Sequence, residues 1–277
     1  MTISVVILTF NSEDTIGKTL EKAKKVSDDI HVVDSFSADR TLEILKENNV
    51  NVVQRPFESY GAQRNWAIEN LPLKYPWELH LDADEWLSDK LIALINSLKG
   101  SFPDQIDGYF IRRNTMFLGR ELHHAGHSPW HMRLFRHGKG HCENRRYDQH
   151  YYVVGKTEQL NGAMIDDMRM SLNEWITRHN KWASAEALEI YEGESSGRIT
   201  PALLGNPVQK IRFLRLIYES FPLFVRPFLY FFYRYFLRLG FLDGKEGLIY
   251  IVLQSFWFRF LVDAKFFELQ LSRNRER

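Results

Sequence analysis

Two aspartates one position apart, Asp82 and Asp84, are the side chains of this 277-residue sequence best suited to chemistry. They lie in the run Leu81-Asp82-Ala83-Asp84-Glu85, which directly follows an apolar segment that starts at Trp77. Carboxylate oxygens are preferred ligands of hard cations such as Mg²⁺ and Mn²⁺, and such a cation stabilises the charge of a departing diphosphate. We expect Asp84 to bind the metal and Asp82 to reach the metal or a ribose through water.

An Asp-x-Asp pattern is weak when it stands alone. The chain has 15 aspartates, so about one such match is expected by chance, and a solvated turn is the alternative interpretation. This match follows a predicted buried strand, and a second acidic cluster follows another strand. That position favours a functional site.

The elements expected to position these carboxylates alternate between strand and helix. Short apolar runs rich in β-branched residues predict buried strands at Ile3–Leu8, Ile30–Val33, Val50–Val53 and Trp77–Leu81. Helices are expected between them, with Ser12 and Asp39 as N-terminal caps and Gln63–Asn70 as the third helix. This order is typical of an α/β fold with a mostly parallel, Rossmann-like sheet flanked by helices.

Polar residues follow three of these strands, at the edge where ligands collect in parallel sheets. They are Thr9, Asn11, Asp34, Ser35, Ser37, Asp39, Asp82, Asp84 and Glu85. The sequence contains no Gly-x-Gly-x-x-Gly and no Gly-x-x-x-x-Gly-Lys. A dinucleotide-binding Rossmann enzyme and a P-loop enzyme are therefore disfavoured.

In these segments the sequence resembles the family 2 glycosyltransferases, which have the GT-A fold. The matching stretches, in family order over about the first 115 residues, are Val5–Asn11, Val32–Thr41, Gly61–Asn65 and Leu81–Glu85. The resemblance implies that Thr9 and Asp34 contact the nucleotide base and that Arg64 lies near the nucleotide. It implies that Asp82 and Asp84 serve ribose, diphosphate and metal. The expected nucleotide-sugar site comprises Thr9, Asn11, Asp34, Ser35, Arg64, Asp82, Ala83 and Asp84.

Within that family the sequence looks most like the lipopolysaccharide-core β-1,4-glucosyltransferase type. The shared features are the Arg-Leu-Phe segment Arg133–Phe135 and an amphipathic tail from Ile211 onward. That type usually has Val-His-Glu after Arg-Leu-Phe, whereas this chain has Gly140-His141-Cys142-Glu143 and Tyr147-Asp148-Gln149-His150.

Inverting transfer needs a carboxylate that takes the proton from the acceptor hydroxyl, a role typically worth about 10²–10⁴-fold in rate. Asp148 and Glu143 are the candidates. Asp148 is slightly favoured, because its neighbours Gln149 and His150 can orient both it and the acceptor. The alternative for either carboxylate is a surface ion pair with a nearby arginine.

Six histidines lie within 19 residues, next to the single cysteine, Cys142. They are His123, His124, His127, His131, His137 and His141. Zinc binding is one interpretation, although the paired or regularly spaced ligands of structural zinc sites are missing. Contacts to an acceptor or phosphate, and ordinary loop packing, are the alternatives. We expect the surrounding region, 117–167, to be rich in loops.

The C-terminal part of the chain differs from the rest in charge and composition. From Arg198 onward there are 13 Lys and Arg against 6 Asp and Glu, together with 19 of the 39 aromatic residues. Arg226, Arg234 and Arg238 interrupt the apolar run, and Leu248–Val262 is short, so neither spans a membrane comfortably. We expect this tail to lie on an anionic membrane surface. Closure of the core or a homo-oligomer interface is the alternative, and nucleic-acid binding is disfavoured because the aromatics are embedded in apolar runs.

Three segments follow from these patterns: 1–115 for nucleotide-sugar binding, 116–197 for the acceptor side and 198–277 as the membrane-associating tail. With one cysteine, a reducing cytoplasmic location at the inner face of the plasma membrane fits best. The predicted function is inverting, metal-dependent transfer of one sugar to a lipid-linked or lipopolysaccharide-core acceptor. A nucleotidyltransferase on a similar sheet, or a non-catalytic membrane-bound scaffold, is the alternative.

Overall fold

The computed structural model describes residues 2–126, 130–146, 148–193 and 199–275, and it divides into two compact units. Unit 1 comprises Met1–Met116, Ser128–Glu143 and Gln149–Arg169, and unit 2 comprises Phe117–His127, Asn144–Asp148 and Met170–Arg277. Each unit is therefore assembled from segments that are separated in the sequence. The division by role into 1–115, 116–197 and 198–277 stays a prediction.

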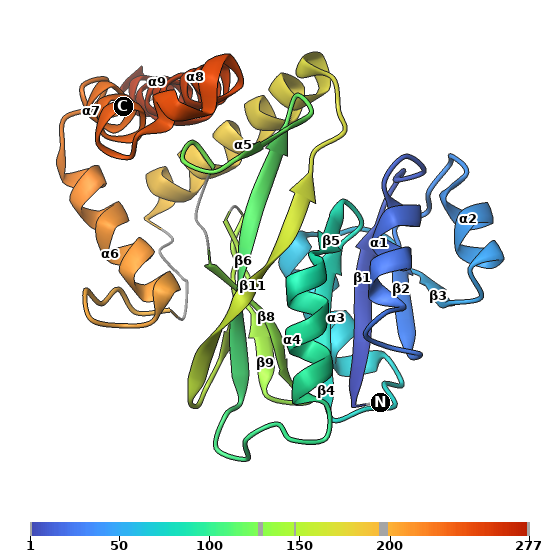
Figure 1. The fold of residues 1–277 in the computed structure, drawn as a ribbon. Helices are drawn as coiled ribbons and strands as arrows, with labels where there is room; N and C mark the ends of the chain where they lie inside the picture. The colour runs from blue at the N-terminus through green and yellow to red at the C-terminus, as the bar shows by residue number, and fades with distance from the viewer. Residues whose placement is uncertain (1, 127–129, 147, 194–198, 276–277) are drawn as a thin grey trace. The chain divides into compact units, whose positions relative to one another are not determined.

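Unit 1 is built on a mixed β-sheet flanked by helices (Figure 1). Its strands follow the spatial order β3 (Asn51–Gln54), β2 (Ile30–Asp34), β1 (Ile3–Thr9), β4 (Trp77–Asp82), β8 (Trp130–Arg136), β6 (Gly108–Phe117), β11 (Thr157–Asp167) and β5 (Glu85–Leu87). The pairs β1–β2, β1–β4 and β2–β3 are parallel, so the expected parallel α/β half is confirmed. Strand β8 runs antiparallel to both β4 and β6.

Side chains of β1 alternate between the two faces of the sheet and contribute to a separate core on each. The helices of unit 1 are α1 (Ile16–Ala23), α2 (Thr41–Glu47), α3 (Tyr60–Asn70) and α4 (Asp89–Leu98). Ile3, Val5 and Ile7 pack with α1, α2 and α4 on one face. Val6 packs with Ala67 of α3 on the other. Because both faces are covered, the strand is mostly apolar, as expected for a parallel sheet, and its polar residues Ser4 and Thr9 are buried.

Helices α1 and α2 begin later than the sequence predicted. Their N-terminal caps are Thr15 and Arg40, whereas Ser12 and Asp39 were expected. The Asp39 carboxylate still accepts from the backbone N–H of Thr41, the first residue of α2, at 3.0 Å, and its Oδ2 also accepts from that of Glu13 at 3.1 Å. This contact joins the β1–α1 and β2–α2 loops.

The segment 117–167 contains several strands, so the prediction of a loop-rich region was wrong. Besides β8 and β11 these are β7 (Arg120–Leu122), β9 (Gly140–Cys142) and β10 (Tyr151–Val153), of which β9 and β10 pair antiparallel. Glycine is uncommon inside strands, yet Gly140 is the first residue of β9. A Cβ at Gly140 would lie 2.1 Å from the ring of Phe135, so the missing side chain lets that ring pack against β9.

Unit 2 is mainly helical. Its helices are α5 (Leu172–Glu192), α6 (Pro207–Ser220), α7 (Arg226–Phe232), η1 (Tyr233–Leu237), η2 (Gly240–Asp243), α8 (Gly244–Ile251), η3 (Val252–Trp257) and α9 (Phe258–Arg275). Helix α5 has Ser171 as its N-terminal cap, and the Ser171 and Glu174 side chains form a capping box. Ala183 and Ala187 of α5 pack against Phe258 and Val262 of α9, so the tail forms part of a folded core.

Among the described residues, one helical run is long and apolar enough to cross a membrane by length and composition alone. It extends over Gly240–Arg273 with a mean hydropathy of 1.3. Of its most apolar window, 44% is buried inside the structure. This run does not by itself decide whether the chain spans a membrane.

Candidate active site

The ends of β1, β2 and β4 bring three predicted site residues to one edge of the sheet in unit 1. Thr9 pairs in register with Asp34, and Leu8 pairs in register with Asp82. Because these strands are parallel, their carboxyl ends meet at this edge. The structure therefore brings together Thr9, Asp34 and Asp82.

Hydrogen bonds join the loops that follow β1 and β2 at this edge. Asp34 is buried, and its carboxylate accepts from the backbone N–H of Ser37 and from Nε2 of Gln54, both at 3.0 Å. The backbone of Asn11 has a positive φ of 47°, and its Oδ1 accepts from the N–H of Ala38 at 2.8 Å. Asp34 and Asn11 thus organise the loops that line the predicted nucleotide site.

Ser35 connects this edge to α3. Its backbone N–H donates to the carbonyl of Thr9 at 3.0 Å, and its Oγ accepts from Nε2 of Gln63 at 3.2 Å. The next residue of α3, Arg64, is buried and points to Asp82.

Asp82 lies between two guanidinium groups. Nη2 of Arg64 lies 3.2 Å from its carboxylate, and Nη2 of Arg133 lies 3.0 Å away. Burial alone would raise the pKa of Asp82, but these two cations hold it well below its usual range. The same Nη2 of Arg133 donates to Oε1 of Glu85 at 2.7 Å. Burial, together with the charge of Asp82, raises the pKa of Glu85 to about 7 despite Arg133.

Several polar atoms at this edge lack a hydrogen-bond partner in the described part of the chain although they are buried. They are Oγ1 of Thr9, Nε of Arg64, and Nε and Nη1 of Arg133. Buried polar groups are nearly always satisfied in folded proteins. These atoms suit the oxygen atoms of a bound ligand, and most of them are guanidinium donors that suit an anionic one.

Asp84 and Ala83 form the turn between β4 and β5. The backbone N–H of Ala83 donates to the carbonyl of Leu8 at 3.1 Å, and its carbonyl accepts from Oγ1 of Thr19 at 2.9 Å. Asp84 is half-buried, and its carbonyl accepts from the N–H of Asp167 at 2.9 Å. The backbone of the turn is thus anchored at both residues.

Carboxylates of Asp82 and Asp84 supply the hard oxygen donors that Mg²⁺ or Mn²⁺ prefers, so the residues present fit such an ion. Within residues 2–126, 130–146, 148–193 and 199–275 no three His, Cys, Asp or Glu side chains are grouped to hold a metal. Substrate oxygens would therefore complete the coordination. The histidines of the cluster that the structure describes therefore take part in no such metal-binding group. His127 lies outside the described residues.

The two candidate bases belong to different units. Glu143, in unit 1, is buried directly after β9, and its Oε2 accepts from the backbone N–H of His150 at 3.2 Å. Its neighbour Cys142 is held by Asn65 of α3, whose Nδ2 donates to the Cys142 carbonyl at 3.0 Å. Glu143 is thereby tied to the helix that carries Arg64.

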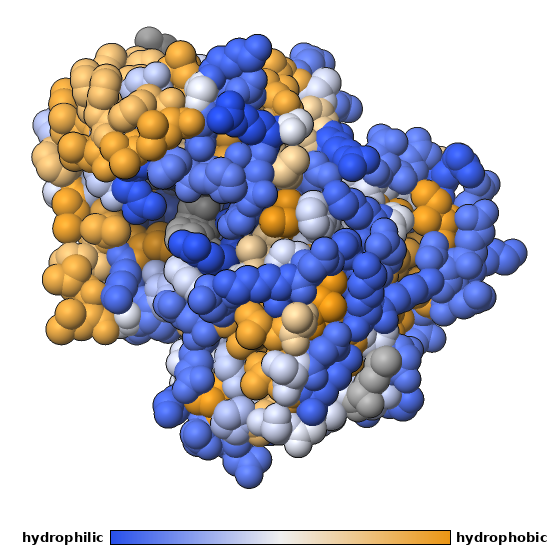
Figure 2. All heavy atoms as spheres, viewed as in Figure 1, coloured by the Kyte–Doolittle hydropathy of each residue, from blue (hydrophilic) through white to orange (hydrophobic). Residues whose placement is uncertain are grey.

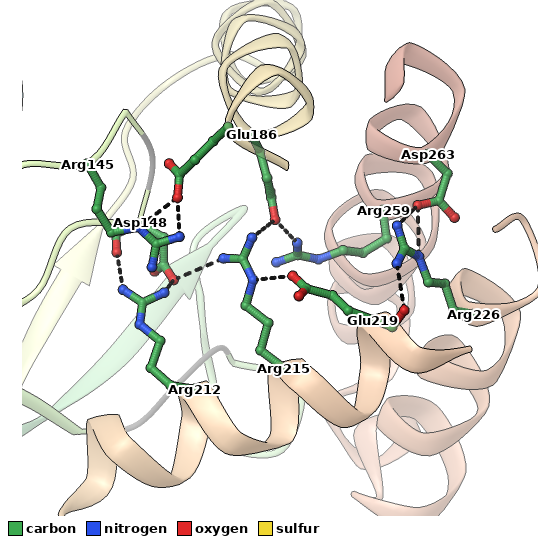
Figure 3. A network of polar contacts seen from close by, with 10 residues as sticks. Arg145, Asp148, Glu186, Arg212, Arg215, Glu219, Arg226, Arg259 and Asp263 are labelled. Carbon is green, nitrogen blue, oxygen red and sulfur yellow. Dashed lines mark hydrogen bonds and ion pairs between the residues drawn. The ribbon is translucent and has the colours of Figure 1, made fainter. Parts of the chain in front are cut away.

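Asp148, in unit 2, is engaged by arginines of α6 (Figure 3). Its Oδ2 lies 2.9 Å from Nη1 of Arg212 and 3.7 Å from Nη1 of Arg215. Nη2 of Arg212 also donates to its backbone carbonyl at 2.8 Å. Asp148 is thus already paired with two cations.

Arg133 contacts Asp82 and Glu85 at this edge, whereas in the sequence it was noted only as part of the Arg-Leu-Phe segment. It is buried in β8 between the apolar residues Met132 and Leu134. Burying an arginine inside an apolar strand costs free energy unless a carboxylate or another acceptor pairs with it. An arginine between apolar residues is therefore a sequence signal for a buried ion pair.

Comparisons with known proteins agree with this geometry. The model of glycosyl transferase family 2 matches residues 4–157. A glycosyltransferase of Rickettsia typhi is 27% identical over 98% of this chain and 89% of its own length, and one of Rickettsia prowazekii is 26% identical over 97% and 88%. The structure of residues 1–349 of S. aureus TarS with UDP-GlcNAc covers all of this chain and 93% of that one, with 15% identity and a TM-score of 0.50. With the family match extending across the Asp82 edge, the chain belongs to glycosyl transferase family 2 and is a glycosyltransferase with a GT-A fold.

Proposed function

We propose that this enzyme transfers one sugar, with inversion, from a nucleoside diphosphate sugar to a lipid-linked or lipopolysaccharide-core acceptor. The observation that carries the proposal is the edge where Asp82 lies between Arg64 and Arg133, with buried guanidinium nitrogens left over. A diphosphate offers the oxygen acceptors that these donors lack.

Asp84 and Asp82 would hold Mg²⁺ or Mn²⁺, which when bound neutralises charge on the departing diphosphate. Arg64 and Arg133 add positive charge from the protein at the same place. Thr9 and Asp34, at the adjoining strand ends, are proposed to orient the nucleotide base.

We place proton removal from the acceptor hydroxyl on Glu143 and not on Asp148. Two arginines already engage Asp148, whereas Glu143 lies beside Cys142 on the strand that Asn65 ties to α3. The acceptor would thus be deprotonated from the unit that binds the donor. This choice reverses the preference drawn from neighbouring residues in the sequence.

Thermal stabilisation tests the function. Purified protein is heated with MnCl₂ and each of a panel of UDP, GDP and dTDP sugars, UDP-GlcNAc among them because the TarS structure holds it. One nucleotide class is expected to raise the melting temperature only when the metal is present. Absence of stabilisation by every nucleotide would contradict the proposal.

Membrane association is the second part of the proposal. Helices α6 to α9 expose many large apolar side chains, and Figure 2 shows hydrophobic surface gathered over these helices. On α7 and η1 they include Phe228, Leu229, Phe232, Tyr233, Phe236 and Leu237. Exposed apolar patches of this kind mark interaction surfaces. The exposed basic side chains of Lys210, Arg238 and Lys245 suit anionic lipid headgroups.

The arginines that interrupt the apolar run do not oppose this interpretation. Arg226 is buried, and its Nε donates to Oδ1 of Asp263 at 2.9 Å. Arg234 is also buried, and its Nη2 donates to the backbone carbonyls of Ala125 and Gly126. Both charges are thus satisfied inside unit 2, which leaves the outer face of α7 and η1 apolar.

Flotation with phosphatidylglycerol vesicles tests the membrane surface. The double variant Phe232→Ser, Phe236→Ser removes two exposed rings and is expected to reduce flotation strongly. Phe57→Ser, which removes an exposed ring of unit 1, is the matched control and is expected to float like the parent. Equal flotation of all three proteins would contradict membrane binding, and a concentration-dependent dimer lost in the double variant would indicate a homo-oligomer interface.

A further inference from the structure

Three buried polar side chains form a line beneath Asp82 in unit 1. Glu78 and His80 lie on β4, four and two residues before Asp82. The pleat therefore places Glu78, His80 and Asp82 on the same face of the strand. Tyr151, the first residue of β10, contacts His80. The exposed fractions are 0% for Glu78, 1% for His80 and 5% for Tyr151.

Hydrogen bonds set the direction of each proton along this line. Nε2 of His80 lies 2.8 Å from Oε2 of Glu78, and a carboxylate accepts, so Nε2 carries the hydrogen. Nδ1 is then free to accept from the Tyr151 hydroxyl, 3.1 Å away. Burial raises the pKa of Tyr151, so the phenol keeps the hydrogen that it donates.

The Tyr151 ring contacts the two arginines that bind Asp82. The guanidinium carbons of Arg64 and Arg133 lie 5.3 and 5.7 Å from the ring centroid, within the range of cation–π contacts. These are the two guanidiniums that donate to Asp82. The His80 ring also stacks on the Phe135 ring, with centroids 4.9 Å apart and an angle of 16° between the ring planes.

A line of this kind is a costly way to fill a core. Burying a glutamate and a histidine costs free energy that apolar side chains of similar volume would not. What the line adds is a fixed ring angle, because the hydroxyl bond to His80 stops the Tyr151 ring from tilting. We propose that Glu78, His80 and Tyr151 are positioning residues that hold Arg64 and Arg133, and through them Asp82, in the geometry that binds the donor diphosphate. The proposal rests on the proposed role of Asp82.

Cys142 allows a test that needs no donor. It is the single cysteine of the chain and is 4% exposed. Surrounding side chains shield its thiol from reagents, and Arg64 lies beside it. Its rate of reaction with the thiol reagent DTNB therefore reports how firmly Arg64 is packed.

Two variants break the line while keeping a ring at each position. Tyr151→Phe and His80→Phe both delete the hydroxyl–imidazole bond, and each is expected to speed DTNB labelling about tenfold, the usual scale for losing an orienting partner. Tyr109→Phe, which deletes another buried phenol hydroxyl of unit 1, should label at the parent rate. Unchanged labelling in both line variants would overturn the proposal.

Calorimetry with UDP and MnCl₂ separates positioning from general destabilisation. Each single variant is expected to weaken UDP binding about tenfold, and the double variant no more than His80→Phe alone, because the bond lost in Tyr151→Phe is also lost in His80→Phe. Additive losses, or losses equalled by Tyr109→Phe, would contradict a shared positioning role. If the parent protein bound no nucleotide, the proposed function would fail while the labelling rates still decided whether the line holds Arg64.

Discussion

Two arginines, one in each unit, show how differently buried guanidinium groups are used in this enzyme. In unit 2, Arg215 directs Nε to Glu219 at 2.7 Å, Nη2 to Glu186 at 2.9 Å and Nη1 to Asp148 at 3.7 Å. In unit 1, Arg133 uses Nη2 alone, while its Nε and Nη1 have no hydrogen-bond partner among the described residues. A guanidinium with every nitrogen engaged holds a fold together, whereas one with donors to spare is suited to a ligand.

The surroundings of Arg215 extend the contrast. Figure 3 shows it within a network of arginines and carboxylates contributed by α5, α6, α9 and the segment Asn144–Asp148. Arg226 pairs with Asp263 and Arg259 pairs with Glu186, so opposite charges face each other throughout. Such pairing stabilises little over apolar packing, but removing one partner leaves a buried charge. We therefore assign a structural role to this network.

Asp84→Asn is expected to give the largest loss. It removes a charge from the proposed metal site, and transfer should fall at least about a thousandfold, the upper range for losing one electrostatic contact in a transition state. Steady-state transfer with saturating MnCl₂ measures it. Asp89→Asn, an exposed carboxylate on α4, is the control and should retain nearly full activity. Equal activity of both variants would remove Asp84 from the site.

Glu143→Gln is expected to lower kcat about a hundredfold while UDP binding stays intact, because only proton removal is lost. Asp148→Asn should cost no more than a few-fold, since that carboxylate is already paired with Arg212 and Arg215. Parallel kinetics and calorimetry of the two variants decide between them. The reverse ranking would return the base to Asp148.

Arg133→Met and Arg215→Met compare the two arginines directly. The first is expected to weaken UDP binding about tenfold, because a charge-assisted donor to the diphosphate disappears. The second should leave UDP binding unchanged but lower the free energy of unfolding by about 3 kcal/mol, because it strands carboxylates inside unit 2. Calorimetry and chemical denaturation measure the two effects. Similar profiles for both variants would break the distinction drawn between them.

His179 gives unit 2 a smaller, pH-dependent effect. Burial lowers its pKa from 6.5 to about 4, although its bond to the Trp175 carbonyl opposes the shift. Between pH 6.5 and pH 4, His179 binds a proton in the unfolded chain but stays neutral in the folded one. Its contribution to the free energy of unfolding is therefore complete above pH 6.5 and is lost as the pH falls toward 4. We expect a loss of about 2 kcal/mol between pH 8 and pH 5.

Denaturation of His179→Asn at the two pH values checks this expectation. The difference between them should shrink in that variant, whereas His141→Asn, which removes an exposed histidine of unit 1, should keep it. A pH dependence unaffected by His179→Asn would assign the acid sensitivity to another group.

The parallel half of the sheet could be predicted because its information is local. Ile3–Leu8 is apolar at every position except Ser4, so a strand covered on both faces was the consistent interpretation, and β1 confirms it. The later strands of the sheet were missed because they are mixed in polarity, as in β11, where exposed and buried residues alternate irregularly. Their pairing depends on partners distant in the chain.

The same limit applies to the site and to the tail. Asp82 followed a recognisable strand, but the partner that neutralises it, Arg133, lies 51 residues later. Glu78, His80 and Asp82 did carry a local signal, since polar residues at every second position of a buried strand mark one face. For the burial of Arg226 no local signal exists, because its partner Asp263 lies 37 residues away.

The interleaved segments of unit 2 have a consequence for biosynthesis. The backbone N–H groups of His123, His124 and Ala125 all donate to the carboxylate of Asp243, which is buried in the folded unit. At about 5–20 residues per second, a ribosome needs about 6–24 seconds to add the intervening residues. Until then these amides have no carboxylate to bind, and unit 2 cannot close while the chain is still growing. The apolar face of α7 and η1 therefore emerges before its own unit is complete, when a nearby lipid surface or a chaperone could shield it.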